Sequence, residues 1–480
     1  MASRKTLTVD NMVTLGTERL ATMLVELAED SPEIKRRLRL ELAAAEGGEA
    51  IAAEIGKRIV ALKAARSFVD WQKRREFVKD LDLQRAMIAD RLAPTRPDLA
   101  LDLMWRFMDL AEPVIERVDD SNGSVGDVFR SACDDLGVIA ATARPDQTGL
   151  ADRIFTAIST NDYGVFDGLV EGMLPALAEI GAARLEARLV EALIERPDNA
   201  DGRDWRASAL RRALQAIADG RADVDAWIAL IPPWDRASPG IGAAIGRRLL
   251  AAGRTKEALT ALETAKPKRH AARAHDRDDP FDIMDGGGDS DWEEVYIEAL
   301  DADGQIGLAQ QLRWAGFEQR LSATRLRAYL KRLPDFEDFE AERRALRHAL
   351  GYRSFATALH FLHEWPDPAG AAQLVLARHA EIDGNLYYLL DSAARQIEGK
   401  HPLAATLLRR AMIEDTLSGA KSTRYKHAAR HLLECRSLAT SIADHAPFET
   451  HEAFVSRLRA KHGRKSGFWS LDAALTDARS

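Results

Sequence analysis

Cysteine is nearly absent from this chain of 480 residues, which contains only Cys133 and Cys435. Two thiols cannot build a disulfide framework or a four-cysteine zinc site, and such sparse use is typical of a reducing compartment. No run approaches the ~18 apolar residues of a membrane span. The opening MASRKTLTVDNMV lacks the apolar core of a signal peptide. We therefore expect a soluble cytoplasmic protein.

Aromatic residues are also scarce, at 6%, whereas charged residues make up 30% and hydrophobic residues 46%. This balance suits long amphipathic helices better than sheets, and no strand-like alternation stands out. The net charge of −8 argues against a general nucleic-acid-binding protein. It leaves room only for a local basic face.

Motifs for catalysis and nucleotide binding are missing too. The chain contains no G-x-S-x-G and no H-E-x-x-H. The nearest approach to a P-loop, at Gly56-Lys57, has Ile51 in place of the first glycine and Arg58 in place of Ser or Thr. The sequence therefore predicts no catalytic residue and no cofactor.

What the sequence does contain is a glycine-to-alanine spacing that recurs along its second half. Each glycine follows an apolar helix end, and an alanine stands five residues after it. The copies are Gly253/Ala258, Gly304/Ala309, Gly351/Ala356 and Gly399/Ala404. Glycine tolerates the left-handed conformation that ends a helix, and a small residue lets the next helix pack closely. A period near ~50 residues indicates a helical repeat.

We accordingly expect an all-α fold, an α-solenoid of TPR/HEAT-like helical repeats, with more than 60% helix. Each repeat should hold three helices, for example 305–319, 322–333 and 338–350. Shifts in composition divide the chain into four regions. These are an N-terminal helical region at 1–145, helical repeats at 146–266, a flexible linker or loop at 267–291, and C-terminal helical repeats with a capping tail at 292–480.

The expected linker moves from basic to acidic and ends in three glycines, with few apolar residues. Such a segment cannot bury much surface. We expect 270–290 to be mobile and open to proteolysis.

One cluster has the residue types of a zinc site. His427, His431 and Cys435 stand at i, i+4 and i+8 of a predicted helix. However, successive i, i+4 side chains climb ~6 Å along a helix, so three in a line rarely converge on one ion. We predict packing and surface roles and no metal.

An acidic turn offers a second candidate for a cation. Asp119, Asp120 and Asp127 surround a Ser/Asn/Gly turn that has the oxygen ligands of a hard cation. Capping of the following helix by Asp127 or Ser124 is the simpler interpretation.

The C-terminal tail is basic and ends in an aromatic pair. It contains Arg457, Arg459, Lys461, Arg464, Lys465, Phe468 and Trp469. One interpretation is that the aromatic pair caps the last repeat, which places both rings against the helix that carries Leu432 and Leu433. The other is a binding arm for phosphate, nucleic acid or an acidic partner, with Arg464, Lys465 and Trp469 as candidate binding residues.

Several stretches together resemble an uncharacterised family of bacterial all-helical proteins. They are KRRLRLELAAAEG (35–47), ARSFVDWQKRRE (65–76), DLMWRFMDLAEPVIERVDDSNGSVGDVF (102–129), RLSATRLRAYLKRLPDFEDFEAE (320–342) and HGRKSGFWSL (462–471). That family is similar to the helical region that accompanies SWIM zinc fingers. The resemblance implies a TPR-like fold, but it brings no known activity with it. The Cys-x-Cys pair of the finger is absent, so its metal and partner binding do not carry over.

Three functions remain open at this stage. The leading hypothesis is a non-enzymatic repeat scaffold that binds a protein or peptide. The second is an accessory nucleic-acid-associated protein that uses the basic tail. The third is an enzyme whose pocket joins residues far apart in the sequence.

Overall fold

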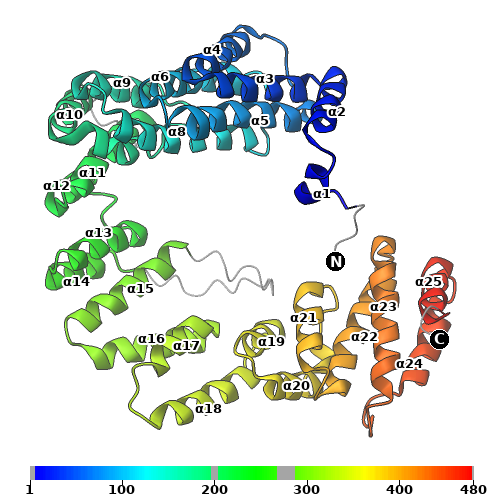
Figure 1. The fold of residues 1–480 in the computed structure, drawn as a ribbon. Coiled ribbons are helices and arrows are strands. Elements are labelled where there is room, and N and C mark those ends of the chain that lie inside the picture. Colours follow the sequence, from blue (N-terminus) through cyan, green and yellow to red (C-terminus); the bar gives the residue numbers. More distant parts are fainter. Residues whose placement is uncertain (1–5, 196–203, 268–286, 478–480) are drawn as a thin grey trace. The chain divides into compact units, whose positions relative to one another are not determined.

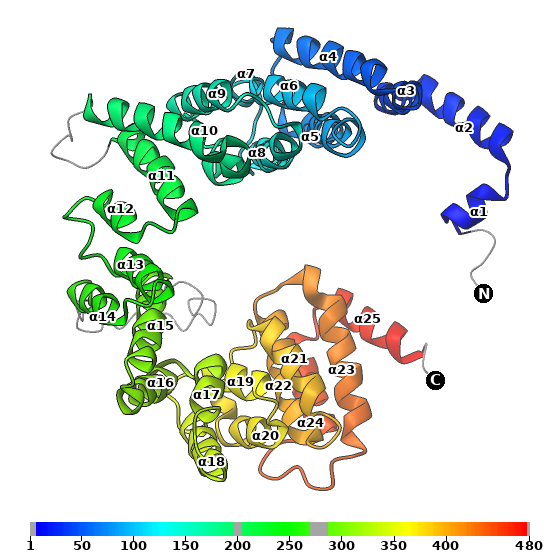
Figure 2. The same ribbon diagram turned by 60° about the vertical axis from the view of Figure 1, so that its left-hand side comes forward.

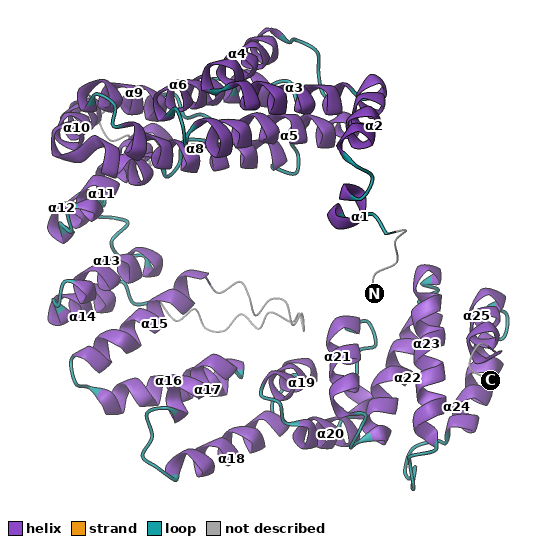
Figure 3. Ribbon diagram, viewed as in Figure 1, coloured by secondary structure: helices purple, strands orange, loops and turns teal. Residues whose placement is uncertain are grey.

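The computed structural model of the chain describes residues 6–195, 204–267 and 287–477. Helices make up 76% of the chain, and no strand is found among the described residues (Figure 3). The only sheet-like pairing among them is an isolated bridge between Val69 and Val118. The predicted all-α fold, with more than 60% helix, is therefore confirmed.

The chain forms two compact units, Met1–Pro232 and Pro233–Ser480, which we call the N-unit and the C-unit. Their boundary lies in the Pro-rich break at 231–240. It does not follow the four expected regions. In particular, the division at 145/146 has no counterpart, because α8 and α9 both pack against α10 in one continuous core.

The described part of the N-unit consists of helices and the loops that connect them (Figure 1). They are α1 (Val9–Val13), α2 (Thr17–Asp30), α3 (Pro32–Glu46), α4 (Gly48–Ala64), α5 (Trp71–Ala86), the π-helix η1 (Met87–Leu92), α6 (Pro97–Met108), α7 (Ala111–Ile115), α8 (Ser124–Ala143), α9 (Gln147–Ser159), α10 (Leu169–Ile194), α11 (Trp205–Gly220) and α12 (Val224–Ala229).

Helix α8 lies at the centre of the N-unit and contacts α5, α6 and α10. The approach to α10 is close because both helices present glycine there. A Cβ on Gly137 would lie only 2.6 Å from the carbonyl oxygen of Gly172. Phe107 of α6 and Phe129 of α8 are fully buried beside each other, with ring centroids 5.3 Å apart. This packing fixes α6, which carries part of the site described below.

The cap of α8 differs from the expected one. The carboxylate of Asp120 accepts hydrogen bonds from the backbone N–H groups of Val125 (2.8 Å) and Gly126 (3.0 Å). Asp127 instead pairs with Arg130, one turn further along the helix. The predicted capping by Asp127 or Ser124 is wrong, because the turn folds back far enough for the earlier aspartate to reach the free N–H groups.

The C-unit continues with helices that pack mainly on their neighbours in the sequence (Figure 2). They are α13 (Pro239–Ala251), α14 (Thr255–Thr264), α15 (Gly287–Ala302), α16 (Ile306–Arg320), α17 (Ala323–Leu330), α18 (Glu337–Leu350), α19 (Phe355–Glu364), α20 (Pro368–Ala377), η3 (His379–Glu381), α21 (Tyr387–Ile397), α22 (Pro402–Ser418), η4 (Ser422–Arg424), α23 (Tyr425–Ala439), α24 (His451–His462) and α25 (Ser466–Asp477).

Contacts between successive helices are the mark of a helical repeat array. In the C-unit, α13 contacts α14 and α15, α15 contacts α16, and the chain continues in this way to α23 and α25. The expected triplet at 305–319, 322–333 and 338–350 corresponds to α16, α17 and α18.

All four alanines of the repeat are buried. Their exposed fractions are 0% for Ala258, 0% for Ala309, 8% for Ala356 and 1% for Ala404. The predicted burial of Ala309 and Ala356 is confirmed.

Only two of the four repeat glycines adopt the expected left-handed conformation. Gly253 (φ +72°) and Gly304 (φ +81°) are left-handed. Gly351 has φ −92°, because its N–H bonds to the His348 carbonyl and tightens the last turn of α18. Gly399 is not left-handed either.

Replacing Ala309 with leucine tests the repeat register. The larger side chain would overpack a fully buried contact between helices and should lower the free energy of unfolding by about 1–3 kcal/mol. Ala302→Leu is the matched control, since Ala302 is exposed at the end of α15 and has room for the extra atoms. Thermal melts of both variants measure the difference. If Ala309→Leu melts at the same temperature as the control Ala302→Leu, the proposed repeat register is wrong.

Most of the expected linker at 267–291 lies outside the described residues, which omit 268–286. Its last residues are helical, because α15 begins at Gly287. The predicted mobility of 270–290 therefore stays a prediction for the part that is not described.

Candidate functional site

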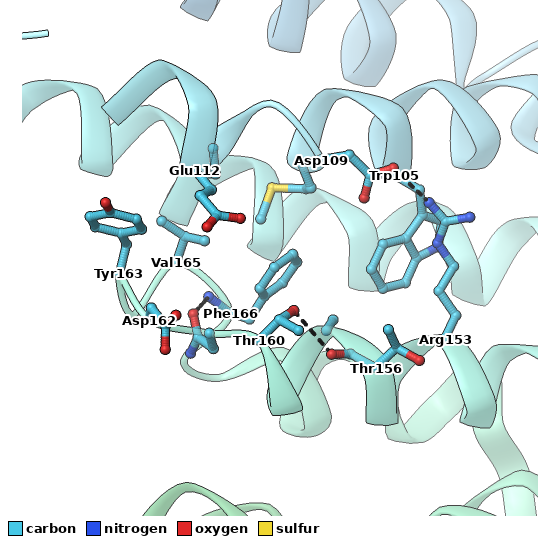
Figure 4. Close-up of a pocket in the computed structure, with 14 residues that line it drawn as sticks. Trp105, Asp109, Glu112, Arg153, Thr156, Thr160, Asp162, Tyr163, Val165 and Phe166 are labelled. Carbon is cyan, nitrogen blue, oxygen red and sulfur yellow. Dashed lines mark hydrogen bonds and ion pairs between the residues drawn. The ribbon is translucent and has the colours of Figure 1, made fainter. Parts of the chain in front are cut away.

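A cavity of about 460 Å³ opens in the N-unit between α6–α7 on one side and α9 with its following loop on the other (Figure 4). Trp105 comes from α6, Glu112 from α7 and Arg153 from α9. Tyr163 and Phe166 come from the loop 160–168. Aromatic rings and acidic side chains therefore line the same space.

The side chain of Asn161 shapes the loop that carries Tyr163 and Phe166. Its Oδ1 accepts from the backbone N–H of Phe166 (3.0 Å), and its Nδ2 donates to the carboxylate of Asp167 (2.8 Å). Gly164 has φ +67°, which lets the chain turn between the two aromatic residues. Phe166 then lies beside Trp105, with ring centroids 6.4 Å apart.

The face of Trp105 already holds one guanidinium group. The Cζ of Arg153 lies 4.8 Å from the centre of the Trp105 ring, and the same side chain forms an ion pair with Asp109 at 3.3 Å. An arginine that stacks on indole gains a cation–π attraction. The arrangement at this edge of the cavity shows how a cation packs on these rings.

Two of the three carboxylates that line the cavity, those of Glu112 and Asp162, are only weakly engaged. Glu112 points into the cavity from α7 (Figure 4), and no hydrogen bond or ion pair of its carboxylate is found in the described part of the chain. Asp162 lies 3.9 Å from Arg206, at the limit of an ion pair. Loss of solvent, followed by the charges of Glu116, Glu112 and Asp162, raises the pKa of Tyr163. The lining holds three carboxylates, those of Asp109, Glu112 and Asp162, and one arginine, Arg153, which gives the cavity a negative electrostatic potential.

Aromatic rings and an excess of carboxylates over basic groups favour a positively charged group. The nearby hydroxyl groups are not free nucleophiles with an adjacent base, because Thr156 and Thr160 donate to backbone carbonyls of α9, those of Asp152 and Thr156. The geometry suits recognition of a cationic side chain better than covalent chemistry.

The candidate residues of the tail lie in the C-unit, far from this cavity in the sequence. Phe468 is fully buried against α23, in a cluster that includes Leu432. Trp469 is half-buried, and its indole N–H donates to the His462 carbonyl at 3.0 Å. The predicted capping is confirmed for Phe468. Trp469 covers the cluster only partly, because its ring also lies beside Arg459, at 5.1 Å.

The two basic candidates of the tail differ in environment. Arg464 is exposed. Lys465 is half-buried, with its Nζ 6.0 Å from the centre of the Tyr425 ring. Both lie in the short turn between α24 and α25, and Trp469 lies on α25, so the three candidates belong to a folded helical hairpin.

The residues of the histidine–cysteine cluster have separate partners. His427 faces the Tyr387 hydroxyl at 3.4 Å, and His431 lies 3.0 Å from the Glu434 carboxylate. Burial raises the pKa of the Cys435 thiol to about 12, so it stays protonated at neutral pH. A protonated thiol is a poor zinc ligand.

Sequence reasoning missed the cavity in the N-unit. The stretch TNDYGVFDG at 160–168, where aromatic and acidic residues alternate around a glycine, is the local signal that points to it.

No helix in the described ranges 6–195, 204–267 and 287–477 is long and apolar enough to cross a membrane.

The fold defines an all-α protein built from helical repeats. The chain belongs to a family of unknown function, DUF6880, whose model matches residues 2–471. No curated protein matches the chain. A solved structure entitled "Circular tandem repeat protein with novel repeat topology and enhanced subunit contact surfaces" matches over 94% of this chain and 96% of that chain, at 15% identity. Its TM-score of 0.17 is too low to support any conclusion about this fold.

Proposed function

We propose that this protein is a non-enzymatic helical-repeat scaffold that binds a protein or peptide partner, and that the cavity of the N-unit receives an arginine or lysine side chain of that partner. The observation that carries the proposal is the combination of Trp105, Tyr163 and Phe166 with the carboxylate of Glu112, which pairs with none of the described residues. The sparse use of cysteine fits a partner in the cytoplasm.

The chemistry of the cavity supports a cation over other ligands. A guanidinium or ammonium group would lie against aromatic faces and near Glu112, as Arg153 lies against Trp105 and near Asp109. An anion would meet the negative potential described above. A purely apolar group would remove carboxylates from water without compensation.

The nucleic-acid alternative has less support. It uses the basic C-terminal tail as a binding arm, but Phe468 of that tail is buried in the core of the C-unit. The likeness to helical regions beside SWIM fingers remains a hypothesis without a matching motif in this chain.

Neutralising Glu112 tests the proposal. The probe is N-acetyl-arginine amide, with the isosteric but uncharged N-acetyl-citrulline amide as its counterpart. We expect the arginine compound to bind in the millimolar range and the citrulline compound not to bind. Glu112→Gln should weaken binding about tenfold, or ~1.4 kcal/mol, through loss of the charge attraction. Isothermal titration calorimetry measures both.

The matched control is Glu179→Gln, which removes an exposed carboxylate of α10 outside the cavity. This variant should bind N-acetyl-arginine amide with the affinity of the wild type. Equal binding of the arginine and citrulline compounds, or equal losses in the two variants, would contradict a cation site at Glu112.

A further inference from the structure

A second cavity, of about 600 Å³, lies in the C-unit between α22, the turn after η3 and the loop that precedes α24. Helix α22 contributes Arg410, Glu414 and Asp415. The turn contributes Asp383 and Gly384. The turn runs close to α22, since a Cβ on Gly384 would lie 2.1 Å from the Ala411 carbonyl oxygen.

Arg410 is a buried cation that forms no ion pair among the described residues, although the carboxylates of Glu414 and Glu449 line the same cavity. Its exposed fraction is 4%. Its Nη1 donates to the Glu449 carbonyl oxygen at 2.9 Å, and its Cζ lies 4.6 Å from the centre of the Phe454 ring. Its Nε and Nη2 have no hydrogen-bond partner among the described residues. Loss of solvent lowers the pKa of Arg410, which reflects the cost of a buried and unpaired guanidinium.

Other arginines of this chain bind carboxylates through the same two nitrogens, Nε and Nη2, that have no hydrogen-bond partner in Arg410 within the described part of the chain. Arg184 binds both oxygens of Asp152 through Nε and Nη2, at 3.0 and 2.7 Å. Arg378 binds Glu381 in the same way, at 2.9 and 2.6 Å. This two-point geometry selects a planar carboxylate.

The remaining charges of the cavity restrict what else the ligand carries. Four carboxylates line it, those of Asp383, Glu414, Asp415 and Glu449. Arg457 neutralises Glu414 and Glu449 in part, and Lys421 pairs with Asp415 at 2.8 Å. The lining residues still carry more negative than positive charge, so a bare anion such as phosphate is repelled. A ligand that carries a positive group in addition to its negative one is not repelled.

We propose that this cavity binds a free α-amino acid, with its carboxylate on the Nε/Nη2 edge of Arg410 and its ammonium group near the carboxylates of α22. Both nitrogens are buried in the structure, so part of the cavity wall has to move before a ligand reaches them. We assign this movement to the segment 443–449, which has no helix and whose Glu449 carbonyl accepts from Nη1 of Arg410. This site is in the C-unit and does not depend on the proposed function of the N-unit.

Saturation-transfer NMR on the full chain tests the site, with each of the twenty α-amino acids as a probe. We expect at least one to bind. Its amide, which lacks the carboxylate, and its N-acetyl derivative, which lacks the ammonium group, should each bind at least tenfold more weakly. Inorganic phosphate should not compete. Binding of none of the twenty, or equal binding of acid and amide, would overturn the proposal.

Variants locate the binding. Arg410→Met and Arg410→Lys should each reduce the affinity for the bound amino acid at least tenfold, because neither offers the two-point edge. Arg410→Lys keeps the charge and gives a second test if the methionine variant does not fold. The control Arg184→Met removes an arginine of the same geometry in the N-unit and should leave the affinity unchanged. Retained affinity in a folded Arg410 variant would place the amino acid elsewhere and reject this site.

Discussion

Phe468→Ala should lower the free energy of unfolding of the C-unit by about 3–5 kcal/mol. The ring is fully buried, and it joins α25 to a cluster with Leu432 and Cys435 of α23 and Phe454 of α24. It also contacts Tyr425, at a centroid distance of 6.1 Å. Removing the ring leaves a cavity at the end of the repeat array, where no further helix of the described chain covers it. Thermal and urea denaturation measure the loss.

Leu471→Ala is the control for this prediction, because Leu471 lies on the same helix with 37% of its surface exposed. Its effect should stay below ~1 kcal/mol. If Phe468→Ala melts at the wild-type temperature, α25 does not cap the array, and the basic tail becomes a binding arm again.

Arg409→Ala should be nearly as damaging, with a loss of about 3–5 kcal/mol. Only 1% of this side chain is exposed, and it bridges two carboxylates, those of Glu398 and Glu434. Burial opposes the ionisation of Glu434, but hydrogen bonds from His431 and Arg409 outweigh it and lower the pKa of Glu434 to about 2. The ion bridge therefore joins α22 to α23 at neutral pH. Removing the arginine takes its cation away from Glu398 and Glu434, of which Glu434 keeps His431 and Arg430, and leaves an unfilled space between the helices.

The exposed pair Arg343–Glu340 gives the comparison. Both of its side chains are about two-thirds exposed, at 67% and 68%, so Arg343→Ala should cost no more than ~1 kcal/mol. A loss for Arg409→Ala as small as for Arg343→Ala, measured by the same denaturation curves, would show that the buried bridge adds little stability.

The sequence predicts the helical elements of this fold well because their signals are local. The apolar spacing and the terminating residues within 305–350 placed α16, α17 and α18 to within a few residues at each end. The repeat alanines were predicted for the same reason, since a small residue near the start of a returning helix reports close packing. Ala309 and Ala404 are buried as that reasoning requires.

Other features depend on contacts that the local sequence does not encode. Gly351 looks like Gly253 in the sequence, but a hydrogen bond to His348 ends its helix without a left-handed residue. Asp120 caps α8 because the turn before the helix folds back on it. The spacing of residues in the sequence does not predict this path of the backbone. The boundary at Pro232–Pro233 lies in a Pro-rich break within the region 146–266, which the shifts in composition did not divide.

The candidate site could not be predicted in the same way. Trp105, Glu112 and Phe166 come from three segments, and only the packing of α6 and α7 against α9 and its loop brings them together. Nothing in the sequence around Arg410 indicates a binding site. The partners of a charged residue on a predicted helix become known only when the neighbouring helices are placed.

The most direct test of the proposed cation site is the indole N–H spectrum of the full chain, in which nine tryptophans contribute signals. Trp105→Phe assigns the signal of Trp105. Titration with N-acetyl-arginine amide should then shift the Trp105 signal progressively and leave that of Trp469 in place, and N-acetyl-citrulline amide should shift neither. A Trp105 signal that stays fixed up to saturating arginine compound, or that moves equally with the citrulline compound, would contradict capture of a basic side chain by the N-unit.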